Sequence, residues 1–412
     1  MPPRRTKTVC IRQNLTESLL SPAFSIQHSA FSTRVSRPRL VQIASVDQLS
    51  AAAPAWDDLW RRSESTLPTL RARPVAQWVR QFAPRAEFHA LAVEDQGQWV
   101  AALPLVRRKV ARLIDAGTLP LNEWSPSGDL LLDSTARTDT VLDLLVAAMV
   151  ELPWGLWWLD EVAVDAPRWR AFTAAAARAG VAVHYQEQLR IGRIEIDHDW
   201  DAYKHRWSRK HRQQMARHAR RLAERGEVRF SLLSQLAPEE VAGWMRRGFE
   251  VEDRSWKGPA GTSVLRTAGM LDFFTRQAEE LARCGLLELA FLECGGRPVA
   301  FSYGQSAKGV YHSLKVGYDP EYASCSPGQL LRYYLYRRLF GDPPGPTGVT
   351  PVPRWRAIDY MTPSEAHWKW KPTTYSVGRL VIAPRRLLAR AALHAYRHYW
   401  PFVRRLRGVT NR

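Results

Sequence analysis

A hairpin pattern occurs twice in this chain, 199 residues apart, and this repeat limits the possible folds more than any other feature. The first copy reads FHALAVE-DQGQ-WVAALPL and the second reads LLELAFLE-CGGR-PVAFSYG. Each has two apolar runs around a turn with glycine, which predicts a β-hairpin. Four positions are identical in both copies: Glu94 and Glu293, Gly97 and Gly296, Val100 and Val299, Ala101 and Ala300.

The flanking order of helices, hairpin, strand and helix also repeats, which indicates a duplicated domain. A chain of 412 residues is longer than one ordinary core supports. We therefore expect an α/β fold with mixed sheets in two similar halves. The expected divisions are a disordered basic tail at 1–37, an N-terminal domain at 38–190, a C-terminal domain at 191–382 and a basic amphipathic helix at 383–412.

The positive charge is concentrated in three segments. The formal net charge is +19, and residues 1–39, 203–229 and 383–412 carry +6, +8 and +8. The remaining residues are therefore close to neutral. Such patches attract phosphates, anionic lipid or nucleic acid, although a solvated basic surface without a single partner is an equal alternative.

Several classes of protein are disfavoured by composition. The four cysteines, Cys10, Cys284, Cys294 and Cys325, form no C-x-x-C pair, so neither a metal site nor a disulfide framework is expected. No apolar run is long enough to cross a bilayer, and the first residues do not resemble a secretion signal. We expect a cytoplasmic protein that binds no metal and no DNA.

The segment VYHSLKVGYDPEYASCSPGQLLRYYLYRRLF is the most informative for chemistry. It predicts a strand at Val310–Val316, a loop, and a helix at Pro327–Phe340 with Ser326 as its N-cap. Gly328 allows close approach of a ligand to the backbone. A helix N-terminus binds anions, so a pyrophosphate fits here; ordinary helix capping is the alternative.

Together with this segment, SRKHRQQMARHARRLAERGEVRF, FEVEDRSWKGPAGTSVL and GRPVAFSYG resemble the FemAB-like branch of the GNAT superfamily, the BioF-like and CelD-type acetyltransferases. The first half resembles that family at ALAVEDQGQWVAALPLV. The likeness covers about residues 45–382. It implies two tandem GNAT domains and an acyl-CoA co-substrate such as acetyl-CoA.

The resemblance also implies positions for the co-substrate. Pantetheine would follow the strand at Tyr311–Val316, and backbone groups near Val316 and Gly317 would polarise the thioester carbonyl. The pyrophosphate would be cradled by Ser326, Gly328, Gln329 and Leu330. GNAT loops often read R/Q-x-x-G-x-G/A, whereas this loop reads C-S-P-G-Q-L with one glycine.

Acyl transfer from a thioester needs a deprotonated nucleophile, so a carboxylate base is sought. Asp359 ranks first because it lies where a GNAT sheet splays open; Asp253 and Glu252 follow. Each has a structural alternative: Asp359 could cap a helix at Pro363–Trp368, and Asp253 could pair with Arg254 or Lys257. The residues expected to contact substrate are Trp256, Lys257, Lys315 and Asp319.

Three functions remain open. The first is transfer of an acetyl or acyl group from acyl-CoA to an amine or hydroxyl of a sugar or exopolysaccharide precursor. The second is a Fem-type transferase using aminoacyl-tRNA, favoured by the tandem halves and the basic helix at 203–225. The third is a non-catalytic module at a membrane surface, favoured by the basic amphipathic C-terminal segment, which would also place the protein at the inner face of an anionic membrane.

Overall fold

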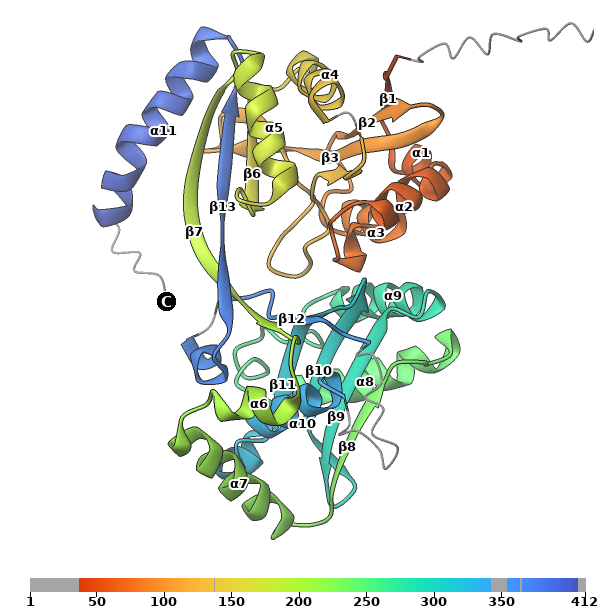
Figure 1. Cartoon of the computed structure of the whole chain (residues 1–412), viewed down its shortest axis with the longest axis vertical. Coiled ribbons are helices and arrows are strands. Elements are labelled where there is room, and N and C mark those ends of the chain that lie inside the picture. The colour runs from red at the N-terminus through yellow and green to blue at the C-terminus, as the bar shows by residue number, and fades with distance from the viewer. Residues whose placement is uncertain (1–36, 137, 342–353, 364, 407–412) are drawn as a thin grey trace, which may run out of the picture. The chain divides into compact units, whose positions relative to one another are not determined.

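The structure is a computed structural model that describes residues 37–406 except 137, 342–353 and 364 (Figure 1). Most of the disordered tail expected at 1–37 therefore lies outside the described residues. The N-terminal half contains the elements β1 (Arg39–Ile43), α1 (Val46–Ala51), α2 (Ala53–Arg62), η1 (Pro68–Leu70), α3 (Ala72–Phe82), β2 (Phe88–Asp95), β3 (Gln98–Val110), β4 (Ile114–Thr118), β5 (Leu131–Leu132), α4 (Thr138–Glu151), β6 (Leu156–Val162), α5 (Pro167–Arg178) and β7 (Ala182–Glu195).

The C-terminal half repeats this order with its own elements. They are α6 (Trp200–His205), α7 (Arg209–Ala223), β8 (Val228–Leu233), α8 (Pro238–Arg254), α9 (Met270–Arg283), β9 (Leu287–Cys294), β10 (Arg297–Ala307), β11 (Val310–Tyr318), η2 (Pro320–Cys325), α10 (Pro327–Leu339), β12 (Ala357–Asp359), η3 (Glu365–Trp370), β13 (Thr373–Ala383) and α11 (Leu387–Leu406).

The sequence predicts one helix from Tyr203 to Gly226, and this prediction is wrong, because α6 and α7 are separate. Ser208 has extended backbone angles and its hydroxyl accepts a hydrogen bond from the amide of His211 at 3.2 Å. This cap starts a new helix. Trp207, in the break, is buried in the core rather than continuing a helical stripe.

The described strands form one sheet whose order mirrors itself about its centre: β1-β2-β3-β4-β6-β13-β7-β12-β11-β10-β9-β8, with β5 against β3. The hairpin β2–β3 occupies the place that β9–β10 occupies in the other half. Both strands of each hairpin begin 199 residues from their counterparts. The repeat in the sequence is therefore a repeat of structure.

The two central strands cross between the halves (Figure 1). β7 leaves the first half to pair with β12 of the second, and β13 returns from the second half to pair with β6 of the first. The division proposed near residue 190 thus falls within β7. The sheet is continuous through this point, so the halves share their central strands.

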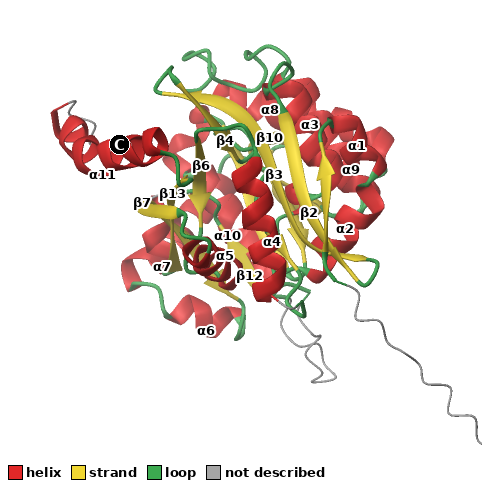
Figure 2. Cartoon of the chain, turned by 90° about the horizontal axis from the view of Figure 1, so that it is seen from above, coloured by secondary structure: helices red, strands yellow, loops and turns green. Residues whose placement is uncertain are grey.

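Helices cover both faces of the sheet in each half (Figure 2). On β2, Leu91 and Val93 pack with α4 and α5, whereas Ala90 and Ala92 pack with α1 to α3. Strand β9 alternates in the same way between a core beneath α8 and α9 and a core beneath α7 and α10. Because both faces are buried, these strands read as nearly continuous apolar runs.

Candidate active site

The first component of the candidate site is a break in the sheet along β11. β11 pairs in parallel with β12 only from Val310 to His312, because β12 ends at Asp359, so the rest of β11 has no partner among the described strands on this side. On the other side, Tyr303 of β10 pairs with Lys315 and Gly304 pairs with Ser313, which leaves Leu314 as the extra residue of a β-bulge. Bulges are enriched beside active sites because they redirect side chains. The residues from Ser313 to Val316 are consequently half-buried within a central strand.

The second component is the N-terminus of α10. Ser326 is the N-cap residue, as predicted, but it has left-handed backbone angles (φ 48°) and its side chain makes no capping hydrogen bond. Gly328 follows in the first turn. A Cβ atom placed there would make an ordinary van der Waals contact with the Tyr318 ring, at 3.5 Å, so a side chain can be accommodated at this position. The amide groups of a first helical turn have no partner within the helix and attract anions.

The predicted co-substrate residues differ in accessibility. Leu330, in the first turn of α10, is fully buried, and the side chain of Gln329 accepts a hydrogen bond from the Trp370 indole at 3.1 Å. Both side chains therefore contact the protein beneath the first turn of α10. Gly317 is required by packing, because a Cβ atom there would lie 2.7 Å from the Cα of Glu252 in α8. Val316 remains half-buried on the edge of β11 beyond the end of β12.

Helix α7 places positive charge next to this loop. It packs against α10 and η2, and Arg225 just after it donates to the carbonyl of Glu321 at 2.8 Å. Basic side chains on the outer face of α7 are exposed: Arg209, Lys210, Arg217, Arg220 and Arg221. A phosphate-rich donor bound at the start of α10 would meet this charge.

A charged cluster lies where α8 packs on β11. Glu252 is buried and forms an ion pair with Lys257 at 2.6 Å, while its other oxygen accepts from the amide of Val264 at 3.1 Å. Lys315 lies over the rings of Trp124 and Phe274 at 4.8 and 5.4 Å. Burial lowers the pKa of Lys315 to about 8. This amine is therefore easier to deprotonate than an ordinary lysine.

The other predicted carboxylates are held by cations. Asp253 forms an ion pair with Arg266 at 2.9 Å and accepts a hydrogen bond from the Ser263 hydroxyl. These are not the partners, Arg254 or Lys257, that the sequence suggested. The hydrogen bond from Arg266 lowers the pKa of Asp253, which makes it a weak base. Asp319 accepts from Arg254 and from Arg297, both at 2.7 Å, and from the amide of Glu321 at 3.0 Å.

Trp256, predicted to contact substrate, is 68% exposed at the end of α8. Among the described residues it belongs to no hydrophobic core cluster. An exposed tryptophan is free to stack on a ligand.

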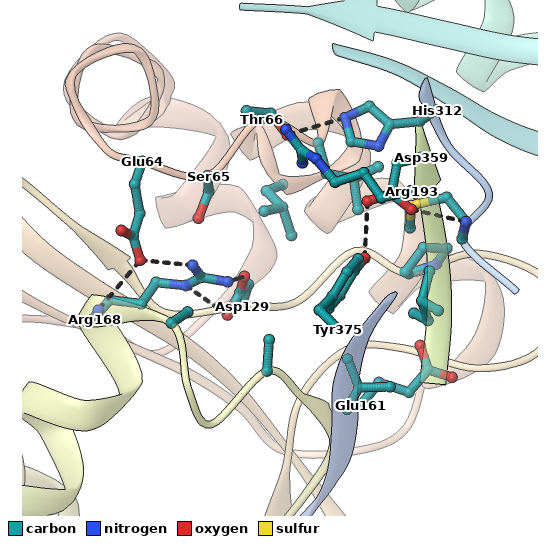
Figure 3. Close-up of a pocket in the computed structure, with 18 of the residues that line it drawn as sticks. Glu64, Ser65, Thr66, Asp129, Glu161, Arg168, Arg193, His312, Asp359 and Tyr375 are labelled. Atoms are coloured by element: carbon teal, nitrogen blue, oxygen red, sulfur yellow. Dashed lines mark hydrogen bonds and ion pairs between the residues drawn. The ribbon is translucent and has the colours of Figure 1, made fainter. Parts of the chain in front are cut away.

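A cavity of about 520 Å³ lies between the two halves (Figure 3). Its walls come from the loop after α2, the loops after β4 and β6, and the central strands β7, β12 and β13. The lining includes five carboxylates and three guanidinium groups: Glu64, Asp129, Glu161, Asp165 and Asp359, and Arg168, Arg193 and Arg356.

Asp359 lines this cavity at the end of β12. Register places it between His312 of β11 and Arg193 of β7. Its carboxylate accepts from the Tyr375 hydroxyl at 2.8 Å and from the amide of Met361 at 2.9 Å (Figure 3). Burial raises its pKa. Within the described residues these partners are not helix amides, so the capping role that the sequence offered as an alternative is not seen there.

His312 lies on the same side of the sheet as Asp359, whereas their neighbours Tyr311 and Ile358 pack under α10. The cavity and α10 are therefore on opposite faces of these two strands. Burial lowers the pKa of His312 to about 3, and its Nε2 lies 3.1 Å from the Thr66 hydroxyl. The imidazole ring is therefore neutral, and its contact with Thr66 connects it to the loop after α2, which forms the opposite wall of the cavity.

Sequence reasoning missed Glu161, Arg193, His312 and Tyr375. Glu161 and His312 are polar residues within strands that are otherwise largely apolar, whereas Arg193 and Tyr375 lie in polar parts of β7 and β13 and gave no such signal. None belongs to a motif, and strands from both halves bring them together.

Residues 209–344 match the family model described as an acetyltransferase (GNAT) domain. No curated protein matches the chain. Among solved structures, FemX is similar at a TM-score of 0.55 and 12% identity, over 82% of this chain and 98% of FemX.

Two other solved structures have similar folds. A protein described as the C-terminal domain of a lysylphosphatidylglycerol synthetase from Agrobacterium fabrum matches at a TM-score of 0.50 and 14% identity, over 85% of this chain and 97% of that one. A conserved protein of unknown function from Bacteroides thetaiotaomicron matches at 0.51 and 12%, over 81% and 97%. At such identities the likeness concerns the fold alone.

The C-terminal half thus contains an acyltransferase domain of the GNAT superfamily. The whole chain has the FemAB-like tandem GNAT fold, which confirms the fold class and the superfamily expected from the sequence.

Proposed function

We propose that this protein transfers an acetyl or acyl group from acyl-CoA to an amine or hydroxyl group. The observation that carries the proposal is the edge of β11 beyond the end of β12, which lies beside the first turn of α10. This arrangement offers an extended strand edge for pantetheine and a helix N-terminus for pyrophosphate. The acceptor class suggested by the sequence is a sugar or exopolysaccharide precursor.

The proposed roles of the chain follow from its geometry. Backbone groups at Val316 and Gly317 polarise the thioester carbonyl, and the first turn of α10 holds the phosphates. Asp359 is the proposed base, because its raised pKa favours proton uptake. Lys315 and Lys257 supply positive charge on the α8 side of β11.

Acetyl-CoA binding to wild type and to Gly328→Asp tests the donor site. The new carboxylate has room in the structure and suits a helix N-terminus, so the variant should fold. It would repel a pyrophosphate. Gly243→Asp, at an open position in α8, is the matched control.

We expect acetyl-CoA to raise the unfolding temperature of wild type and of Gly243→Asp but not of Gly328→Asp. A ligand at 100 times its Kd adds about 2.7 kcal/mol to stability. No effect of acetyl-CoA or longer acyl-CoAs on wild type would overturn the proposal.

A second candidate is the aminoacyl-tRNA-dependent transfer of Fem-type proteins. The exposed basic face of α7 beside η2 favours it, because a polynucleotide needs a broader positive surface than CoA. Binding of charged tRNA without binding of acyl-CoA would support this alternative. The non-catalytic alternative requires that neither donor leads to transfer.

We also propose that α11 contacts an anionic membrane. The described part of the chain contains no helix long and apolar enough to cross a bilayer. α11 packs on the sheet through Ala389 and Leu393, yet Leu387 and Leu388 at its start are 88% and 86% exposed. Residues 383–412 contain eight arginines and no acid.

A further inference from the structure

Glu161 occupies an unusual position on β6. Val162 pairs with Gly378 and Leu159 pairs with Leu380, so β6 has one more residue than β13 in this interval. This is a β-bulge, and Glu161 within it has φ 55°. Such angles are uncommon and costly for a residue other than glycine or asparagine.

The bulge determines where the carboxylate lies. Leu159 and Val162 both pack in the core beneath α4 and α5, although they are three residues apart. Regular alternation would place Glu161 on the same face as Leu159, in that apolar core. Because of the extra residue, Glu161 does not share the face of Leu159. Its side chain instead lines the cavity between the halves, where it is accessible to solvent (Figure 3).

The charges around Glu161 define what the cavity prefers. Arg168 is already paired with Glu64 at 2.7 Å and with Asp129 at 2.6 Å. Within the described part of the chain, no ion pair is formed by Glu161 or Asp165. Arg193 and Arg356 also line the cavity, and Arg193 is paired with Glu195 at 2.6 Å. With five carboxylates against three guanidinium groups, the lining favours a cationic ligand.

We propose that the cavity binds its ligand through a cationic nitrogen and that Glu161 is the carboxylate that contacts it. The N-terminal half thereby contributes a specificity-determining residue to the site that the C-terminal half opens at Asp359. Desolvation by the surrounding protein, together with the neighbouring Asp160, raises the pKa of Glu161 to about 7 even though part of its side chain is exposed to solvent. The identification of this ligand as the acyl acceptor rests on the proposed function, whereas the preference for a cationic nitrogen does not.

Matched ligand pairs test the inference by calorimetry at pH 8. The probes are glucosamine with glucose, and 1,5-diaminopentane with 1,5-pentanediol, which differ in the amine. We expect at least one amine to bind wild type more tightly than its neutral partner. Glu161→Gln should weaken that amine about tenfold or more, the loss of a charge-assisted hydrogen bond. Glu151→Gln, an exposed acid at the end of α4, makes the same charge change and should bind like wild type.

The outcomes separate this inference from the proposed function. Absence of binding by either amine, equal binding of the neutral partners, or unchanged amine binding by Glu161→Gln would overturn the inference. If acetyl-CoA fails to bind while amine binding still depends on Glu161, the donor proposal fails and the cationic site stands. If acetyl-CoA binds and amine binding is the same in wild type and Glu161→Gln, only the inference fails.

Discussion

At the scale of single residues, Glu161 is the clearest case of a side chain whose position costs stability. Its left-handed backbone is strained, by about 1 kcal/mol or more, and nearby Asp160 adds repulsion to the penalty of burial. Asparagine tolerates this backbone region and carries no charge. We therefore expect Glu161→Asn to unfold at a higher temperature than wild type at pH 8.

The pH dependence of that gain has a definite sign. Folding raises the pKa of Glu161 from 4.5 to about 7, so the folded state holds the proton to higher pH than the unfolded state. The electrostatic cost is absent below about pH 4.5 and complete above about pH 7. The stabilisation by Glu161→Asn should shrink as the pH falls from 8 to 5. A lower unfolding temperature for the variant at pH 8 would mean that Glu161 has a structural role instead.

Residue-scale features were only partly predictable from sequence. Gly328 and Asp359 could be selected because each lies next to a recognisable helix start or strand end. Glu161 could not, since its direction depends on one unpaired residue in β6. The ion-pair partner of Asp253 could not be predicted either, because Arg266 belongs to a loop whose path does not follow from the sequence.

At the scale of elements, Lys308 joins the two halves. It lies in the turn between β10 and β11, and its ammonium donates to the carbonyls of Ser63 and Ser65 at 2.8 and 2.7 Å, and to that of Trp60. This fixes the loop after α2, which forms one wall of the cavity. The next residue along, Thr66, contacts His312 of β11.

Lys308→Met should release that loop. Three carbonyls lose their donor while the aliphatic stem remains, so we expect the variant to lose about 1–3 kcal/mol of stability. Hydrogen exchange at residues 63–67 should accelerate more than in the rest of α2 and α3. Lys210→Met, on the exposed face of α7, controls for loss of a lysine charge. Unchanged exchange in this loop would show that its other contacts suffice to hold it.

Elements were largely predictable where local patterning was strong. Both hairpins and the helix after Ser326 follow from alternation, turn glycines and the proline in the first helical turn. The exchange of β7 and β13 between halves was not predictable, because strand pairing between distant segments depends on three-dimensional register. That exchange also explains why the cavity escaped sequence reasoning, since its walls come from segments up to about 300 residues apart.

At the scale of the molecule, the C-terminal helix α11 combines basic residues with exposed apolar surface. The two leucines at the start of α11 lie beside Arg386 and Arg390, and the segment carries no acid. Basic residues attract anionic headgroups, and exposed leucines gain free energy by entering the interface. A surface of this kind would hold the protein near lipid-linked acceptors.

Vesicle co-sedimentation tests this membrane contact. We expect wild type to bind vesicles of phosphatidylglycerol and phosphatidylcholine, to ignore pure phosphatidylcholine, and to dissociate as salt is raised. The double variant Leu387→Ser with Leu388→Ser should bind about tenfold more weakly, because two leucine side chains no longer enter the interface. Leu113→Ser removes an equally exposed leucine (85%) from the turn between β3 and β4 and should bind like wild type. If all three proteins bind equally, the arginines act without the leucines and α11 is a solvated basic helix. The cavity and donor-site proposals would be unaffected, since neither depends on α11.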